Sequence, residues 1–526
     1  MVRNSKDNRE GRVLAASAVF AAIVGIGWLS VSNSLAQEST PASKATNEPP
    51  RGVDPGEARE VKAEPSAPDD PSTVESPPPP AAKPLPKPKL MNLRYDEDFS
   101  YLDGGEGTYQ KDFFDPIKNI HVLDDWRVSF GGEARYRIES ETNRTFGADE
   151  RSQDTFGLFR LLLHSDVKYR KLFRFFAQGI LTIDEDRDLA ERATDENRGD
   201  LHQLFVDFRF LGEESPWTLR LGRQELAYGR QRFVGSPDFG NNRKRFDAAK
   251  IFSKGEQWDV DFFFFKPVLV QRKQSDRWDE DVDVYGAYVT YKGIPRHGID
   301  VYAMAVDDTG NRRNPNGRSG DADIYSIGSR FWGKTAGFDY ETELTDQWGH
   351  WAGDRVHSLS WATDGGYTLA EVPWKPRIGS GFDWASGDKN PQDGEVSTFD
   401  PLFGAFHDYF GYLDIVGRQN ISAVNVNVGA WPIADVLNGT MTFYTFWLND
   451  RDDALYNELK QPIRRDVTGN SGREVGHELD VRFRWQIDPH SFVLAGYSHF
   501  WASDFISRTG SSEDVDWFYL HYGIKF

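Results

Sequence analysis

Arginine and acidic side chains alternate with apolar ones along residues 126–139, WRVSFGGEARYRIE. Arginine stays charged at any accessible pH and binds carboxylates in a forked geometry, so a row of arginines can bind or select anions. Charged residues occupy similar alternating positions in later segments. The candidates for lining a pore are Arg127, Glu133, Arg135, Arg137, Arg160, Arg174, Asp207, Arg220, Arg223, Glu478, Asp480, Arg482 and Arg484. Rings of arginine in a pore select for anions. Ladders of arginine and carboxylate side chains can instead have a purely structural role and brace the barrel wall. The set favours selectivity, and either role is open for any single arginine.

Catalytic and metal-binding patterns are weak. The pair His477-Glu478 lacks the second histidine of a helical zinc motif, and Ser386-Gly387-Asp388 has no paired histidine. The chain contains no cysteine, which excludes disulfides and thiolate chemistry, and its net charge of −20 argues against nucleic-acid binding. The sequence therefore predicts a non-enzymatic protein that needs no cofactor or metal.

The elements that would position the charged residues are β-strands. Period-two alternation gives a strand one apolar and one polar face. About 18 such segments follow one another up to the C-terminus, each on the order of ten residues. Tight turns such as residues 292–295 and 487–490 alternate with long polar loops such as 142–155, 307–322 and 449–474. This rhythm predicts an all-β fold, a transmembrane antiparallel β-barrel of about 18 strands. A large soluble β-protein is the alternative.

The N-terminal residues have a different composition. Residues 1–36 contain a basic start, an apolar run and Ser34-Leu35-Ala36, which is typical of a signal peptide; an uncleaved inner-membrane anchor is the alternative. Residues 37–90 form a proline-rich linker expected to be disordered. Residues 91–119 are predicted to be a periplasmic lead-in, and residues 120–526 the barrel. The final alternating segment ends on Phe526, as in proteins assembled into the bacterial outer membrane.

Four stretches, which follow in order along the barrel segment, resemble the alginate-export family of outer-membrane porins, and the resemblance covers about residues 120–526. They are LRLGRQELAYGRQRFVGSPDFGNNRKRFDAAKIF (219–252), SGDKNPQDGEVSTFDPLFGAFHDYFGYLDIVGRQNI (386–421), FYTFWLNDRDDALY (443–456) and VGHELDVRFRW (475–485). The resemblance implies an 18-stranded barrel that passes an anionic uronate polysaccharide through an arginine-lined constriction. The implied partners are this polysaccharide, outer-membrane lipid and periplasmic secretion proteins.

The resemblance marks Arg220 and Arg223 of LRLGRQ as pore arginines, with Asp207 of FVDF (205–208) and Glu478 and Asp480 of GHELD as acidic partners. The alternative function is a general or solute-specific porin for small anions or sugars. A hydrolase acting at the barrel rim is a third hypothesis, but no clustered Ser, His and acidic residues support it.

The spacing of Arg220 and Arg223 poses a geometric problem. In a regular strand they face opposite sides, and an arginine at the bilayer midplane costs roughly 2–4 kcal/mol. We therefore expect either a bulge near Gly222 that returns both to the lumen, which is the preferred alternative, or Arg223 placed beyond the apolar band. Replacing both with alanine is expected to lower anion selectivity and leave the barrel folded.

Overall fold

The computed structural model describes residue 85 and residues 87–526, except 106, 150, 190, 191, 193, 273, 406 and 408. The predicted signal peptide and almost all of the predicted linker lie outside these residues. Residues 86–526 form one compact unit.

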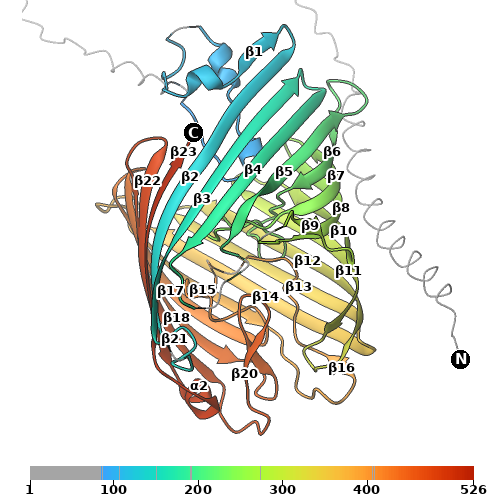
Figure 1. The fold of residues 1–526 in the computed structure, drawn as a ribbon, viewed down its shortest axis with the longest axis vertical. Coiled ribbons are helices and arrows are strands. Elements are labelled where there is room, and N and C mark those ends of the chain that lie inside the picture. The colour runs from blue at the N-terminus through green and yellow to red at the C-terminus, as the bar shows by residue number, and fades with distance from the viewer. Residues whose placement is uncertain are drawn as a thin grey trace, which may run out of the picture. The chain divides into compact units, whose positions relative to one another are not determined.

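Eighteen antiparallel strands, each paired with its neighbours along the chain, close into a barrel through the pairing of β2 with β23 (Figure 1). They are β2 (Trp126–Thr142), β3 (Gln153–Tyr169), β4 (Phe173–Glu185), β5 (Asn197–Arg209), β6 (Trp217–Gln224), β7 (Phe246–Lys254), β8 (Trp258–Leu269), β10 (Val282–Tyr291), β11 (His297–Arg313), β12 (Ser319–Thr335), β13 (Phe338–Trp351), β14 (Asp354–Thr368), β15 (Arg377–Ala385), β17 (Ile421–Ile433), β18 (Leu437–Leu448), β21 (Glu474–Gln486), β22 (Ser491–Ala502) and β23 (Val515–Lys525). The predicted barrel is confirmed.

Short elements lie in the connections and in the N-terminal segment. They are η1 (Arg94–Asp96), η2 (Ser100–Asp103), η3 (Asp115–Ile117), β1 (Ile120–Leu123), β9 (Arg277–Trp278), β16 (Glu395–Val396), β19 (Ala454–Tyr456), β20 (Pro462–Arg465) and α2 (Asp504–Thr509). Within the described residues, none of the helices has the length and apolar character needed to cross a membrane.

The two faces of β2 show the alternation expected from its sequence. Phe130 and Ile138 are 46% and 43% exposed on the outer face, whereas Glu133, Arg135 and Arg137 are each 2% exposed inside. Apolar side chains therefore cover the outside of this wall, where a bilayer would contact them, and charged side chains fill the lumen.

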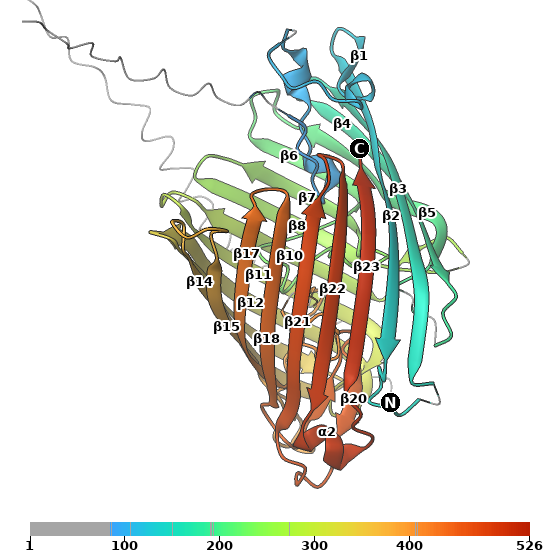
Figure 2. The ribbon, with the colours of Figure 1, turned by 90° about the vertical axis from the view of Figure 1, so that its left-hand side faces the viewer.

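The two ends of the barrel differ in their connections. At the short-turn end, where β2 begins and β23 ends, turns such as residues 336–337 and 487–490 are brief. Figure 2 shows this end beside β1 and the N-terminal segment, with α2 and β20 at the opposite, long-loop end. The prediction of a long loop at residues 307–322 was wrong. These residues are mostly strand, because β11 and β12 continue to a turn at residues 314–318.

Two of the long connections fold into the lumen. Residues 225–245, the crossing loop, link β6 to β7, and residues 386–420, the second loop, link β15 to β17. The two loops join in a parallel bridge between Val234 and Phe403. Apolar side chains of both loops and of the inner wall, including Phe233, Phe399 and Phe265, form a buried core. Packed residues of the two loops therefore fill part of the lumen.

Candidate functional site

The crossing loop is fixed to one wall of the barrel by buried arginines. Arg135 of β2 donates hydrogen bonds to the carbonyl oxygens of Asp238 (2.9 Å) and Gly240 (3.1 Å). Arg160 of β3 donates to the same two carbonyls at 3.0 and 2.9 Å, and it is ion-paired with Glu133. Arg135 and Arg160 are among the largest fully buried side chains of the protein. Both therefore anchor the loop.

Arg137 continues this anchor one position further along the inner face of β2. Its guanidinium donates to the carbonyl oxygen of Phe239 at 2.6 Å and lies 3.9 Å from the centre of the Phe239 ring. It also forms an ion pair with Glu139 at 2.6 Å. Two of the three inward-facing arginines predicted from the 126–139 pattern, Arg135 and Arg137, thus contact the crossing loop.

The carboxylate of Asp238 lies at the centre of this contact. It accepts hydrogen bonds from Arg160 at 2.8 Å and from Arg243 at 2.9 Å, and Lys525 lies 3.6 Å away. Burial by itself raises the pKa of Asp238, but Lys525, Arg160 and Arg243 hold this pKa well below its usual value. Asp238 therefore stays ionised and holds these cations in place.

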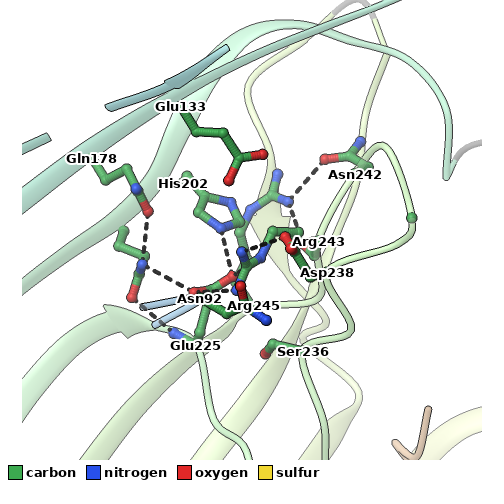
Figure 3. A network of polar contacts seen from close by, with 12 residues as sticks. Asn92, Glu133, Gln178, His202, Glu225, Ser236, Asp238, Asn242, Arg243 and Arg245 are labelled. Atoms are coloured by element: carbon green, nitrogen blue, oxygen red, sulfur yellow. Dashed lines mark hydrogen bonds and ion pairs between the residues drawn. The ribbon is translucent and has the colours of Figure 1, made fainter. Parts of the chain in front are cut away.

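The start and the end of the crossing loop are tied together. Glu225, its first residue, forms an ion pair with Arg243 at 2.5 Å (Figure 3). The same carboxylate contacts His202 at 3.0 Å and accepts a hydrogen bond from Gln203 at 3.3 Å. These contacts close the base of the loop against β5.

The opposite side of the crossing loop reaches the far wall. Arg232 forms ion pairs with Glu341 (2.8 Å) and Glu343 (3.3 Å) of β13, and its Nε lies 3.9 Å from Asp383 of β15. In the order of strand pairing, β13 lies about half a turn of the barrel away from β2 and β3. The crossing loop therefore spans the lumen from wall to wall.

Arg220 and Arg223 form separate ion pairs on opposite faces of β6. Arg220 makes a bidentate pair with Asp207 at 2.6 and 2.8 Å and is 4% exposed. Arg223 makes a bidentate pair with Asp247 at 2.8 and 3.0 Å. The expected bulge near Gly222 was wrong, because β6 keeps an unbroken register with β5 and β7 through this residue. Arg223 stands next to the last residue of β6, as in the second alternative.

Arg220→Ala is expected to lower the free energy of unfolding by about 2 kcal/mol, because it leaves the Asp207 carboxylate without its charged hydrogen-bond donor. Since the guanidinium is already bonded, anion selectivity is expected to change little, unlike the outcome expected from the sequence. Urea unfolding and bilayer conductance of the same variant measure both effects. Loss of selectivity at unchanged stability would contradict this assignment.

The acidic pair of β21 anchors the second loop. Glu478 accepts a hydrogen bond from the backbone N–H of Leu413 at 3.0 Å, and Asp480 accepts one from Tyr412 at 3.1 Å. Arg482 lies 5.2 Å from the centre of the Tyr412 ring. These residues are brought together around one stretch of the loop.

The remaining predicted residues make contacts outside the two loops. Arg484 lies 4.0 Å from the centre of the Phe492 ring. Arg174 forms an ion pair with Asp166 at 2.7 Å. Arg127 lies on the part of β2 that extends past the end of β23, where it contacts backbone oxygens of residues 124 and 126.

A cavity of about 660 Å³ opens on the far wall, near the short-turn end. Five basic residues and three acidic ones line it, together with His297. The basic residues are Arg230, Lys292, Arg296, Arg330 and Lys334, and the acidic ones are Asp339, Glu341 and Asp364. The side chain of Arg230, which the crossing loop carries into this cavity, is 49% exposed. The cavity therefore has an excess of positive charge although the whole chain has a net charge of −20.

The basic residues of this cavity differ in how they are paired. Arg330 is ion-paired with Asp300 and Glu341, both at 2.8 Å. Arg296 and Lys334 are exposed, and no ion pair joins either of them to another residue in the part of the chain that the structure describes. The mouth of the cavity thus offers cations to an entering anion.

Sequence reasoning did not identify this cluster. Arg230 lies in a loop, and nothing in the loop sequence shows that it folds inward. Lys292 and Arg296 flank a tight turn, where basic residues are ordinarily solvated. The available signal was the recurrence of Lys and Arg at successive turns of the short-turn end, at 292, 296 and 334.

A closed barrel of 18 antiparallel strands, with an apolar exterior and a charged lumen, is the architecture of an outer-membrane channel. The family model described as alginate export matches residues 126–519, and the chain belongs to this family. It is a transport channel of the bacterial outer membrane, and not an enzyme. The short-turn end accordingly faces the periplasm.

Solved structures share the fold at low sequence identity. Pseudomonas aeruginosa OpdQ is 14% identical with a TM-score of 0.52, and the match covers 76% of this chain and 97% of that one. Acinetobacter baumannii OccAB2 is 10% identical with a TM-score of 0.51, over 76% of this chain and 98% of that one. No curated protein matches the sequence.

Proposed function

We propose that this channel passes an anionic uronate polysaccharide or oligosaccharide across the outer membrane. The observation that carries the proposal is the cavity beside the crossing loop, where Arg230, Arg296 and Lys334 present positive charge to the lumen. A uronate chain carries one carboxylate on each sugar, so it meets a series of cations along this wall. Family membership supports the same substrate class.

The acidic residues of the cavity have a complementary role in this proposal. Asp339 holds Arg377 in a pair at 2.7 Å, and Glu341 holds Arg330. Interleaved carboxylates keep arginines in position and weaken the hold on a polyanion, so that bound sugar can leave. Transport needs binding that is favourable enough for entry and weak enough for release.

A porin for small anions or sugars is the second candidate. The crossing loop favours it, because the ion pairs Arg160–Asp238 and Arg232–Glu341 fix this loop across the lumen and leave less room for a polymer. The two candidates differ in how binding depends on chain length. A polymer channel should bind several consecutive uronates, whereas a small-anion porin should bind one.

Block of the channel by uronate oligomers of increasing length, measured in planar bilayers, tests the proposal. We expect the blocking affinity to increase with the number of uronate units, because each added carboxylate meets another cation of the cavity. Neutral oligosaccharides of matched length serve as the control. Block that is independent of length favours the small-anion porin. Equal block by neutral sugars overturns the uronate proposal and the small-anion porin, and leaves a porin for sugars.

A further inference from the structure

The predicted lead-in, residues 91–119, begins inside the barrel. The side chain of Asn92 accepts a hydrogen bond from Lys525 at the end of β23 (2.7 Å). Arg94 is 3% exposed and donates a hydrogen bond to the carbonyl oxygen of Phe526 at 2.5 Å. The start of the lead-in therefore sits in the short-turn mouth against the last strand of the barrel.

Tyr95 of the lead-in is buried inside the lumen. Its ring packs edge-on against Phe176 of β4 and Phe205 of β5, with ring centres 6.2 and 5.5 Å apart. The guanidinium of Arg220 lies 4.4 Å from the centre of the same ring. Arg174 donates a hydrogen bond to the Tyr95 carbonyl oxygen at 2.7 Å. Tyr95 thus fills the space in front of β4, β5 and β6.

The same tyrosine contacts the crossing loop. Its hydroxyl donates a hydrogen bond to the carbonyl oxygen of Glu225 at 2.9 Å. The Glu225 carboxylate in turn pairs with Arg243 near the other end of the loop. The N-terminal segment is therefore connected, through one residue, to the base of the loop that spans the lumen.

We propose that residues 91–99 are a periplasmic plug, and that withdrawal of Tyr95 opens a passage along β4, β5 and β6. These residues add no strand to the barrel sheet; a 3-10 turn and side-chain contacts hold them in place. Segments held in this way open at a lower free-energy cost than the sheet itself. The plug and the cationic cavity occupy different walls, so the plug regulates conductance separately from anion preference.

Tyr95→Ala tests the occlusion. Removing the ring is expected to raise single-channel conductance in KCl by about twofold or more, because it clears the space in front of β4 to β6. The matched control is Tyr109→Ala, since Tyr109 is in the same lead-in and packs edge-on against Tyr101. Parent-like conductance of folded Tyr95→Ala, or an equal rise in Tyr109→Ala, overturns the proposal.

A cross-link tests whether the plug moves, without altering Tyr95. The chain has no cysteine, so Asn92→Cys and Lys525→Cys can be joined by a short bismaleimide. In urea below the concentration that unfolds the barrel, conductance of the untreated double variant should rise while that of the cross-linked protein stays constant. The single Lys525→Cys variant controls for loss of the lysine. If the conductance of the cross-linked and the untreated double variant rises equally, or if neither conductance rises, the plug is not the moving part.

These experiments use KCl alone and do not depend on the uronate proposal. A change in conductance at constant selectivity supports the plug whatever the channel carries. If uronate oligomers fail to block the channel while Tyr95→Ala still raises the conductance, only the proposed substrate is overturned.

Discussion

Arg160→Ala is expected to lower the free energy of unfolding of the barrel by about 3–5 kcal/mol, the range for breaking a buried ion pair. The change removes every hydrogen bond from this guanidinium to Glu133, Asp238 and the carbonyl oxygen of Gly240. Glu133, which is 2% exposed, is left with Lys525 at 3.7 Å as its remaining ion-pair partner among the described residues. Urea unfolding, monitored by heat-modifiable gel migration, measures the loss of stability.

Arg355→Ala is the matched control for this prediction. Arg355 forms an ion pair with Glu395 at 2.6 Å, but its side chain is 71% exposed. Exposed pairs contribute about 0–1 kcal/mol, so the control should unfold almost like the parent. Equal unfolding midpoints for Arg160→Ala and the parent would show that the anchor of the crossing loop does not stabilise the barrel.

Reversing the charge of Arg230 is expected to have the largest effect on transport. Arg230→Glu places a carboxylate in the cationic cavity, next to Glu341, which now lies 3.4 Å from the arginine. We expect block by a uronate oligomer to weaken by about tenfold or more, equivalent to ~1.4 kcal/mol. The measurement is the blocker concentration that halves the current in planar bilayers.

Arg355→Glu makes the same charge change away from the cavity, and it should leave block near the parent value. A similar loss in both variants would mean that overall charge, and not the cavity, determines binding. Unchanged block in Arg230→Glu would show that the anion does not pass Arg230.

The wall of the barrel could be predicted from the sequence because it depends on a local property. Alternation in residues 126–139 placed Phe130 outside and Arg135 inside, and repetition of the pattern gave the strand count. The bonding partners of each inward arginine could not be predicted in this way. Arg160 meets Asp238 across 78 residues of sequence, and only the folded crossing loop brings them together.

The position of the β-bulge also could not be predicted from local sequence. Sequence reasoning placed it at Gly222, but a register shift lies in the neighbouring strand, where Gln178 pairs with Gln203 and Gly179 with Leu201. His202 and Gln203 are both fully buried and both contact Glu225. A glycine permits a bulge, whereas contacts across strands decide which strand contains it.

We expect the lumen to prefer anions although the chain as a whole is strongly acidic. The reversal potential of the purified channel in a planar bilayer under a KCl gradient tests this most directly. The basic excess of the cavity predicts a potential with the sign of chloride permeation, reduced in magnitude in Arg230→Glu. A potential with the sign of potassium permeation in the parent channel would contradict it.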